Sequence, residues 1–176
     1  MKISEILKKY NTDKNKKIRK RNWHCYGKAY DHLFKSFDRK AKLDILEIGT
    51  EYGESLLAWR EYFPNASITG VDIIDRVKDK DPSIKYIVAD INDFDTAIDY
   101  DIVIDDGSHK LKDVLHTIHR IKIKVGGIMV IEDVQAPHRL TAIDTDYSIE
   151  RIDLREVSGQ YDDFLIVLRN YGYFNL

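Results

Sequence analysis

The sequence contains a single cysteine, Cys25, and no strong excess of charge of either sign. One cysteine excludes an internal disulfide and is typical of a reducing compartment, and we expect Cys25 to be a small apolar filler. The 28 basic and 30 acidic residues nearly cancel, so the net charge indicates neither a nucleic-acid partner nor a membrane partner.

Long apolar runs are also lacking. The N-terminus has no apolar core of signal-peptide length, and no uncharged run reaches the roughly 18 residues that a membrane span needs. We therefore expect a cytoplasmic protein. Its 176 residues are enough for one globular domain with a substantial core.

Five short apolar runs recur in the order expected for parallel strands, with an acidic residue at or beside the end of each. The runs are 43–48, 67–72, 84–89, 100–105 and 127–132. Between them lie segments such as 55–63 and 111–121, where apolar residues recur at helical spacing. Two later runs, 149–156 and 163–169, are typical of a closing hairpin. The alternation predicts an α/β fold: three layers, doubly wound and Rossmann-like, with a mostly parallel sheet and a C-terminal antiparallel hairpin.

A glycine turn follows the first run. Residues 43–55 read Leu-Asp-Ile-Leu-Glu-Ile-Gly-Thr-Glu-Tyr-Gly-Glu-Ser, a buried strand that leads into Gly49 and Gly53. Because glycine has no Cβ, the backbone can turn sharply here and approach a ligand closely. Asp72 ends the next strand, where its carboxylate can accept both hydroxyls of a ribose. We interpret the segment as a ligand cradle.

The turn lacks the third glycine of a dinucleotide-binding fingerprint, which argues against a pyrophosphate ligand. Its form is Glu47-x-Gly49-x-x-x-Gly53, and the acids at 47 and 51 suit a cationic or zwitterionic ligand better. This form resembles the first motif of the class I S-adenosylmethionine (SAM) methyltransferases. The resemblance runs from about residue 41 to the C-terminus, because that class also closes its sheet with a hairpin.

Acidic residues gather at the ends of the fourth and fifth predicted strands. Residues 101–109 read Asp-Ile-Val-Ile-Asp-Asp-Gly-Ser-His, and residues 131–133 read Ile-Glu-Asp. These strands are neighbours in such a sheet, so Asp106, Glu132 and Asp133 can converge. Carboxylate oxygens are the ligands that Mg²⁺ prefers, whereas zinc would favour histidine or cysteine. Without a cation the acids would repel one another, so either a metal or a proton is needed.

The pattern IDDGSH followed by VIED resembles the metal-dependent O-methyltransferases that act on sugars in macrolide-type antibiotic pathways. The resemblance implies that Asp106, Glu132 and Asp133 hold Mg²⁺ or another hard divalent cation. It also implies that His109 is the general base, beside Asp106 in the catalytic centre. Histidine titrates near neutral pH and can accept a hydroxyl proton, while a metal lowers the pKa of a bound hydroxyl. The alternative for His109 is a cap of the following helix.

The same resemblance implies which residues contact each part of SAM. The glycine turn would pass the methionine, Asp72 would hold the ribose, and Asp90 would lie near the adenine. The residues expected to contact the cofactor in the sheet domain are Glu47, Gly49, Thr50, Gly53, Asp72, Ile73, Asp90, Ile91 and Asp105. Two of them have open alternatives: Glu47 as an internal cap of the turn, and Asp105 as a strand-end carboxylate that caps a backbone group.

Residues 1–40 are predicted to form an N-terminal helical lid segment ahead of a SAM-binding catalytic domain at 41–176. The stretch 8–21 contains eight basic residues and one acid, and aromatic residues follow it. Such a stretch can bind nucleic acid, or it can be a solvated helix face followed by an apolar anchor. The pattern Asn-Thr-Asp-Lys at 11–14, with a later His-x-Tyr, resembles a segment that covers the cofactor in the sugar methyltransferases. The candidate lid contacts are Thr12, Lys14, His24 and Tyr26.

These patterns predict a SAM- and Mg²⁺-dependent O-methyltransferase that acts on a hydroxyl of a sugar or glycoconjugate. The oligomeric state is left open. Two alternatives are a methyltransferase for another small molecule or for nucleic acid, and a non-catalytic SAM-binding protein. An amino-methylating enzyme normally carries an N/D-P-P-Y/F tetrapeptide after the fourth strand, where this chain reads Asp-Asp-Gly-Ser at 105–108. His138 is either an acceptor-pocket residue or a loop histidine.

Overall fold

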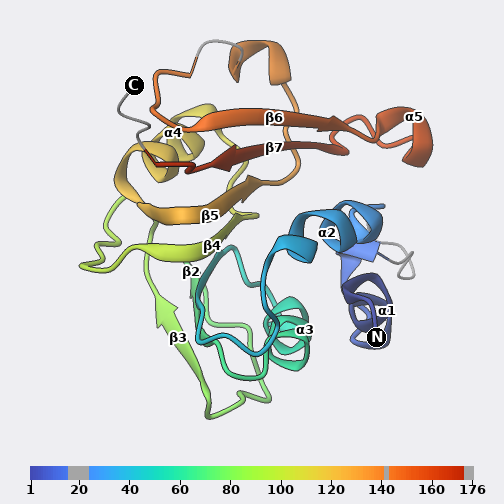
Figure 1. The fold of residues 1–176 in the computed structure, drawn as a ribbon, viewed down its shortest axis with the longest axis vertical. Helices are drawn as coiled ribbons and strands as arrows, with labels where there is room; N and C mark the ends of the chain where they lie inside the picture. Colours follow the sequence, from blue (N-terminus) through green and yellow to red (C-terminus); the bar gives the residue numbers. More distant parts are fainter. Residues whose placement is uncertain (16–23, 141–142, 173–176) are drawn as a thin grey trace.

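The computed structural model of the protein describes residues 1–15, 24–140 and 143–172. Its centre is a seven-stranded sheet with the order β3-β2-β1-β4-β5-β7-β6 (Figure 1). The strands are β1 Asp44–Ile48, β2 Ser67–Asp72, β3 Ile84–Val88, β4 Tyr100–Asp105, β5 Ile123–Ile131, β6 Ser148–Asp153 and β7 Phe164–Arg169. The first five are parallel, and β7 runs antiparallel to both β5 and β6. The predicted fold class is confirmed.

Helices cover both faces of the sheet, which gives three layers (Figure 1). They are α1 Ile3–Lys9, η1 Asp13–Asn15, α2 Gly27–Leu33, η2 Phe34–Ser36, α3 Glu54–Tyr62, α4 Leu111–Arg120, η3 Pro137–Leu140 and α5 Arg155–Ser158. Successive strand residues point to opposite faces, so Ile45 joins the core beneath α1, α2 and α3, and Leu46 joins the core beneath α4. Both strand faces are apolar, as expected for a sheet that is covered on both sides.

The N-terminal segment packs on the same face as α3. Tyr30 and Phe34 pack against Trp59 in tilted and edge-on arrangements, with ring centroids 5.1 and 5.5 Å from that of Trp59. These rings belong to the same core as Ile3 and Ile45. Residues 1–15 and 24–40 therefore share a continuous core with the sheet, which fixes them beside the carboxyl ends of its strands.

Two element boundaries differ from prediction. β5 begins at Ile123, four residues earlier than the apolar run, because it pairs with β4 again beyond an irregularity between Tyr100 and Ile102. The strand predicted to reach residue 156 ends at Asp153 and gives way to α5, which Gly159 terminates in the left-handed conformation.

The basic stretch 8–21 is only partly described, because residues 16–21 lie outside the described ranges. Its role as a lid or a binding surface therefore stays a prediction. Among the described helices, none has the length and apolar character needed to cross a membrane.

Candidate active site

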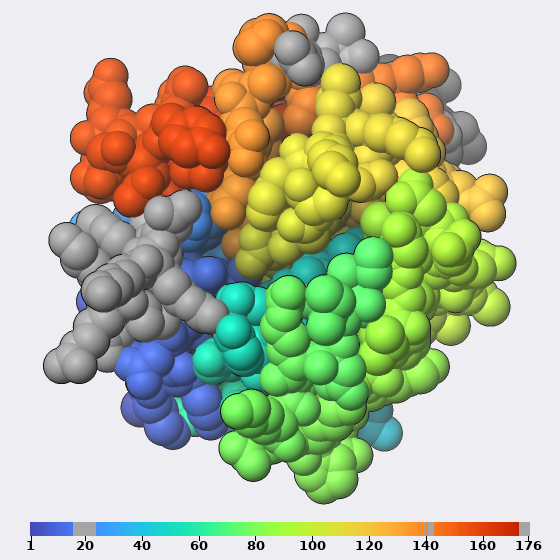
Figure 2. All heavy atoms as spheres, turned by 180° about the vertical axis from the view of Figure 1, so that it is seen from behind, coloured from blue at the N-terminus to red at the C-terminus, as the bar shows by residue number. Residues whose placement is uncertain are grey.

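The candidate site lies at the carboxyl ends of the parallel strands, where open α/β sheets bind ligands. A cavity of about 430 Å³ opens there, within the range of small-molecule sites. Figure 2 shows the molecule hollowed between the green segment after β2 and the yellow segment that includes α4. The predicted site residues that line the cavity are Gly49, Asp72, Ile73, Asp90, Ile91, Asp106, His109 and Asp133.

Gly49 occupies a position that other residues do not fit. Its φ is +81°, and a Cβ there would lie 2.0 Å from the carbonyl oxygen of Asp106. Its N–H donates to the carbonyl of Val71 at 2.8 Å. The ends of β1, β2 and β4 can therefore meet at this turn, as the cradle interpretation requires. Gly53, with φ +83°, lies immediately before α3, and a Cβ there would meet Val77.

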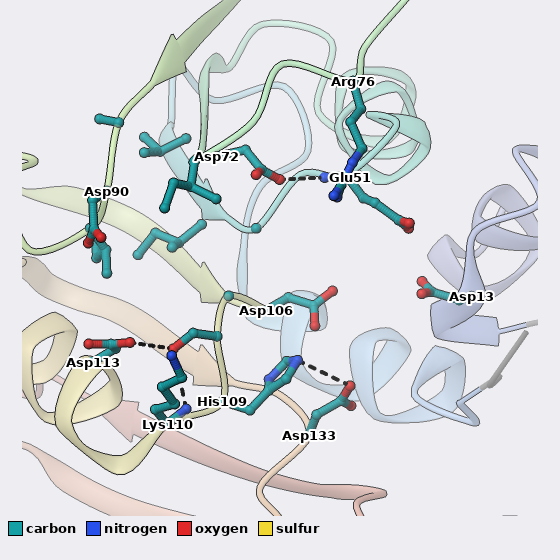
Figure 3. Close-up of a pocket in the computed structure, with 18 residues that line it drawn as sticks. Asp13, Glu51, Asp72, Arg76, Asp90, Asp106, His109, Lys110, Asp113 and Asp133 are labelled. Carbon is teal, nitrogen blue, oxygen red and sulfur yellow. Dashed lines mark hydrogen bonds and ion pairs between the residues drawn. The ribbon is translucent and has the colours of Figure 1, made fainter.

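Asp72 organises the glycine turn from the end of β2. Its Oδ2 accepts hydrogen bonds from the N–H groups of Thr50 and Glu51, at 2.9 and 2.8 Å, and Oδ1 accepts one from Ile74 at 3.0 Å. A carboxylate has about four lone-pair positions, so one remains for a ligand. The ribose contact stays a prediction, since Asp72 has a structural task as well (Figure 3).

Asp90 follows β3 and lines the same cavity as Ile73 and Ile91. Its Oδ1 accepts hydrogen bonds from the backbone N–H and the side-chain amide of Asn92, at 2.9 and 2.8 Å. These bonds lower the pKa of Asp90 below its usual value. The second oxygen, Oδ2, takes no part in either bond.

Glu47 and Asp105 lie behind the cavity. The Oε2 of Glu47 accepts hydrogen bonds from Ser55 and Trp59, both at 2.9 Å, and burial raises its pKa to about 7. Asp105 accepts a hydrogen bond from the N–H of Gly107 at 3.2 Å, and burial raises its pKa to about 6. The Asp105 contact is the backbone cap that the sequence left open as an alternative, whereas Glu47 binds side chains of α3. Contact of either residue with SAM stays a prediction.

Lys14 brings a buried positive charge to the ends of β1, β4 and β5. Its ammonium lies 2.6 Å from Oδ2 of Asp106, 2.7 Å from Oε2 of Glu132 and 3.6 Å from Oε1 of Glu47. Burial opposes the charge, but the three carboxylates outweigh it and hold the pKa of Lys14 well above its usual value. Lys14 therefore compensates part of the acid cluster, a contact that the sequence did not predict.

Asp106, His109 and Asp133 form the group best suited to a cation. Each offers a ligand atom, and these atoms lie within 4.8 Å of one another. His109 and Asp133 point toward each other, with Nε2 3.8 Å from Oδ2 (Figure 3). Burial, and then the charge of Asp106, raise the pKa of Asp133 to about 6. Hard carboxylate oxygens in an electronegative site fit Mg²⁺.

The backbone at this group is strained. His109 has φ +56° and Asp133 has φ +52°, in the left-handed region that non-glycine residues rarely adopt. Such conformations cost about 1–3 kcal/mol each and persist mainly at functional sites.

Glu132 precedes Asp133 in the chain, but its carboxylate is hydrogen-bonded to residues outside this group. It is 2% exposed, and its carboxylate accepts hydrogen bonds from Lys14 through Oε2 and from Tyr30 through Oε1. It is not one of the residues whose ligand atoms lie within 4.8 Å of one another. Its assignment as a metal ligand stays a prediction.

The candidate lid residues contact the acids at the ends of β4 and β5 or lie beside the glycine turn. Tyr26 donates a hydrogen bond to Oδ1 of Asp133. Thr12 and Lys14 border a small cavity of about 30 Å³ together with Thr50. His24 pairs with Asp163, and although burial opposes its charge, that hydrogen bond and Asp133 raise its pKa to about 9.

A second cavity of about 350 Å³ adjoins the first. Both are lined by Ser108, His109, Lys110 and Asp133, so these residues form the shared wall. Glu132, Gln135 and Ala136 line the second cavity as well. His138 is exposed and does not line it.

Several lining residues were not predicted. Arg76, Lys110 and Asp113 line the larger cavity, as do Asp13 and Glu51. Asp13 is part of the Thr-Asp-Lys pattern and Glu51 is part of the glycine turn, so those two carried a signal in the sequence. The other three lie in segments without a motif and are placed by the fold.

The fold and this site define a class of protein: the chain has the class I methyltransferase fold. The MycE methyltransferase in complex with Mg, S-adenosylhomocysteine (SAH) and mycinamycin VI superimposes with a TM-score of 0.75 at 22% identity, over 100% of this chain and 57% of that chain. The N-methyltransferase NodS from Bradyrhizobium japonicum, in complex with SAH, gives a TM-score of 0.59 at 15% identity, over 98% and 100%. At these identities the similarity shows the fold alone.

Curated relatives extend the similarity to sequence, although no protein-family model matches the chain. The 8-demethyl-8-alpha-L-rhamnosyl tetracenomycin-C 2'-O-methyltransferase of Streptomyces olivaceus is 33% identical over 65% of this chain and 34% of its own length. The mycinamicin VI 2''-O-methyltransferase of Micromonospora griseorubida is 32% identical over 75% and 36%. The chain spans about a third of the length of these relatives. The resemblance to the sugar O-methyltransferases is confirmed.

Proposed function

We propose that the chain is a SAM-dependent and divalent-cation-dependent O-methyltransferase that acts on a hydroxyl of a sugar or glycoconjugate. One observation carries the proposal: His109 and Asp133 form part of the wall shared by two adjoining cavities. A methyl donor in one cavity and an acceptor in the other would meet at that wall. The relatives named above are O-methyltransferases of a rhamnosyl tetracenomycin and of mycinamicin VI, which supports the substrate class.

The larger cavity would hold SAM. Its wall combines the Gly49 turn with Asp72, the last residue of β2, and Asp90, which follows β3. These acids suit the ribose and the adenine. Ile73 and Ile91 supply apolar surface for the base. The volume of about 430 Å³ is adequate for a nucleoside-sized ligand.

Asp106 and Asp133 would hold the cation, and the comparison structure with Mg and SAH supports Mg²⁺. Glu132 is the third proposed ligand, because its hydrogen bonds with Lys14 and Tyr30 use about two of its four lone-pair positions. A bound divalent cation would lower the pKa of the acceptor hydroxyl and so favour the alkoxide.

His109 would accept the proton. An acceptor hydroxyl in the smaller cavity gives its proton to the imidazole, its oxygen attacks the methyl carbon, and the carbon–sulfur bond breaks to leave SAH. Asp133, 3.8 Å from Nε2, stabilises the imidazolium that forms. Proximity of donor and acceptor across the wall supplies much of the remaining acceleration.

The test is methyl transfer from SAM to a panel of rhamnosides and macrolide glycosides, followed by mass spectrometry. We expect product with Mg²⁺, suppression by EDTA, and a loss of about 10²–10⁴-fold in kcat for His109→Gln. His119→Gln, at an exposed histidine on α4, is the matched control and should retain activity. Turnover that is insensitive to both EDTA and His109→Gln would contradict the proposal.

A further inference from the structure

A second group of potential metal ligands lies outside the proposed catalytic centre. His24, Asp162 and Asp163 each offer a ligand atom, and these atoms lie within 4.8 Å of one another. All three side chains are buried, with exposures of 6%, 6% and 0%. His24 belongs to the N-terminal segment, whereas the two acids directly precede β7.

The hydrogen bonds within this group leave one oxygen unsatisfied. Asp163 pairs through Oδ1 with Nδ1 of His24, and its Oδ2 accepts bonds of 3.3 Å from the N–H and the thiol of Cys25. Oδ1 of Asp162 is buried and has no hydrogen-bond partner among the described residues. A buried carboxylate oxygen without a donor costs free energy, unless a cation or a proton satisfies it.

The charges around His24 do not balance. Asp133 also faces the ring, with Oδ1 3.4 Å from Nδ1, so three carboxylates surround one imidazole. The ammonium of Lys14 is engaged by Asp106, Glu132 and Glu47. The described surroundings therefore supply less positive charge than the carboxylates require.

We propose that His24, Asp162 and Asp163 form a second divalent-cation site, of the kind that takes Zn²⁺. One imidazole and two carboxylates are the donor set that zinc accepts, whereas Mg²⁺ prefers oxygen ligands alone. The ion joins the N-terminal segment to the start of β7. It acts as a structural clamp next to Asp133, and it does not depend on methyl transfer by the protein.

The experiment measures Zn²⁺ equivalents bound by the full chain after dialysis and gel filtration, with metal analysis of the protein peak. Four proteins are compared: wild type, Asp106→Asn, Asp162→Asn and the double variant. We expect two, one, one and no equivalents, because Asp106, His109 and Asp133 also offer Zn²⁺ one imidazole and two carboxylates, and each substitution removes one carboxylate from one of the two groups. His32→Gln, at an exposed histidine on α2, is the control for non-specific binding and should match the wild type.

The outcomes separate this site from the proposed catalytic metal. If the wild type binds one equivalent and Asp162→Asn binds none, the proposed site at His24, Asp162 and Asp163 is supported. The same result would show that the Asp106 group does not bind Zn²⁺. If Asp162→Asn binds as much Zn²⁺ as the wild type, the group is an ion pair only and the proposal is overturned. A thermal melt gives a second readout, because Zn²⁺ should raise the Tm of Asp106→Asn and leave that of the double variant unchanged.

Discussion

At the scale of single residues, the close approach of backbone segments at Gly49 sets the geometry of the site. Gly49→Ala would place a Cβ 2.0 Å from the carbonyl oxygen of Asp106 at a φ of +81°. The end of β4 would have to move away from β1. We expect a loss of more than about 2 kcal/mol in the free energy of unfolding, measured by urea denaturation.

Gly126→Ala is the matched control for this substitution. Gly126 also has a positive φ, +84°, but among the described residues no heavy atom beyond its chain neighbours lies within 4 Å of the place where a Cβ would stand. Gly126→Ala should therefore lower the free energy of unfolding only by the cost of a left-handed backbone in alanine, about 1–2 kcal/mol. Equal losses at positions 49 and 126 would mean that the close approach at Gly49 is not what requires glycine.

Glu47 makes stability depend on pH. Burial raises its pKa from 4.5 to about 7. Between these two pH values Glu47 is protonated in the folded protein and ionised in the unfolded chain. Stability is therefore lost as pH rises from about 4.5 to 7, by at most about 3 kcal/mol from this group. Glu47→Gln has no such proton, so its stability relative to the wild type should increase between pH 5 and pH 8 in urea denaturation. A pH-independent difference would refute this.

At the scale of elements, Lys14 is the main electrostatic link between η1 and the sheet. Lys14→Met would leave Asp106 and Glu132 without their buried counter-charge, which typically costs about 3–5 kcal/mol. Chemical denaturation should show this loss. Lys9→Met, which removes an exposed ion pair with Glu61, should have little effect and serves as the control. Similar stabilities of the two variants would show that Lys14 does not hold the segment.

The elements that the sequence predicted best are those with a continuous apolar signal. β1, β2 and β4 follow apolar runs that are buried on both faces, and this signal is local. α5 was missed because none of its four residues is buried, so it carries no apolar pattern, and polar contacts such as those between Arg155 and Asp153 stabilise it. The early start of β5 was missed because Lys124 and Gly126 interrupt its apolar pattern.

At the scale of the whole molecule, the site is assembled from segments far apart in the chain. Gly49 and Asp72 could be placed from the sequence because strand-end positions meet at one edge of the sheet. The contacts of Lys14 with Asp106 and Glu132 span 92 and 118 residues. They result from packing of the N-terminal segment, which local patterns do not encode. Glu47 and Asp105 are buried and make internal hydrogen bonds, so their expected contacts with SAM stay predictions.

Calorimetric titration with SAH, the product of SAM, tests most directly whether the cavity lined by Gly49, Asp72 and Asp90 binds the cofactor. We predict binding with a dissociation constant on the order of micromolar for the wild type, and at least about tenfold weaker binding for Asp72→Ala, which loses charged hydrogen bonds. Asp75→Ala, at an exposed acid nearby, should bind as the wild type does. Absence of SAH binding to the wild type, with and without Mg²⁺, would contradict the account.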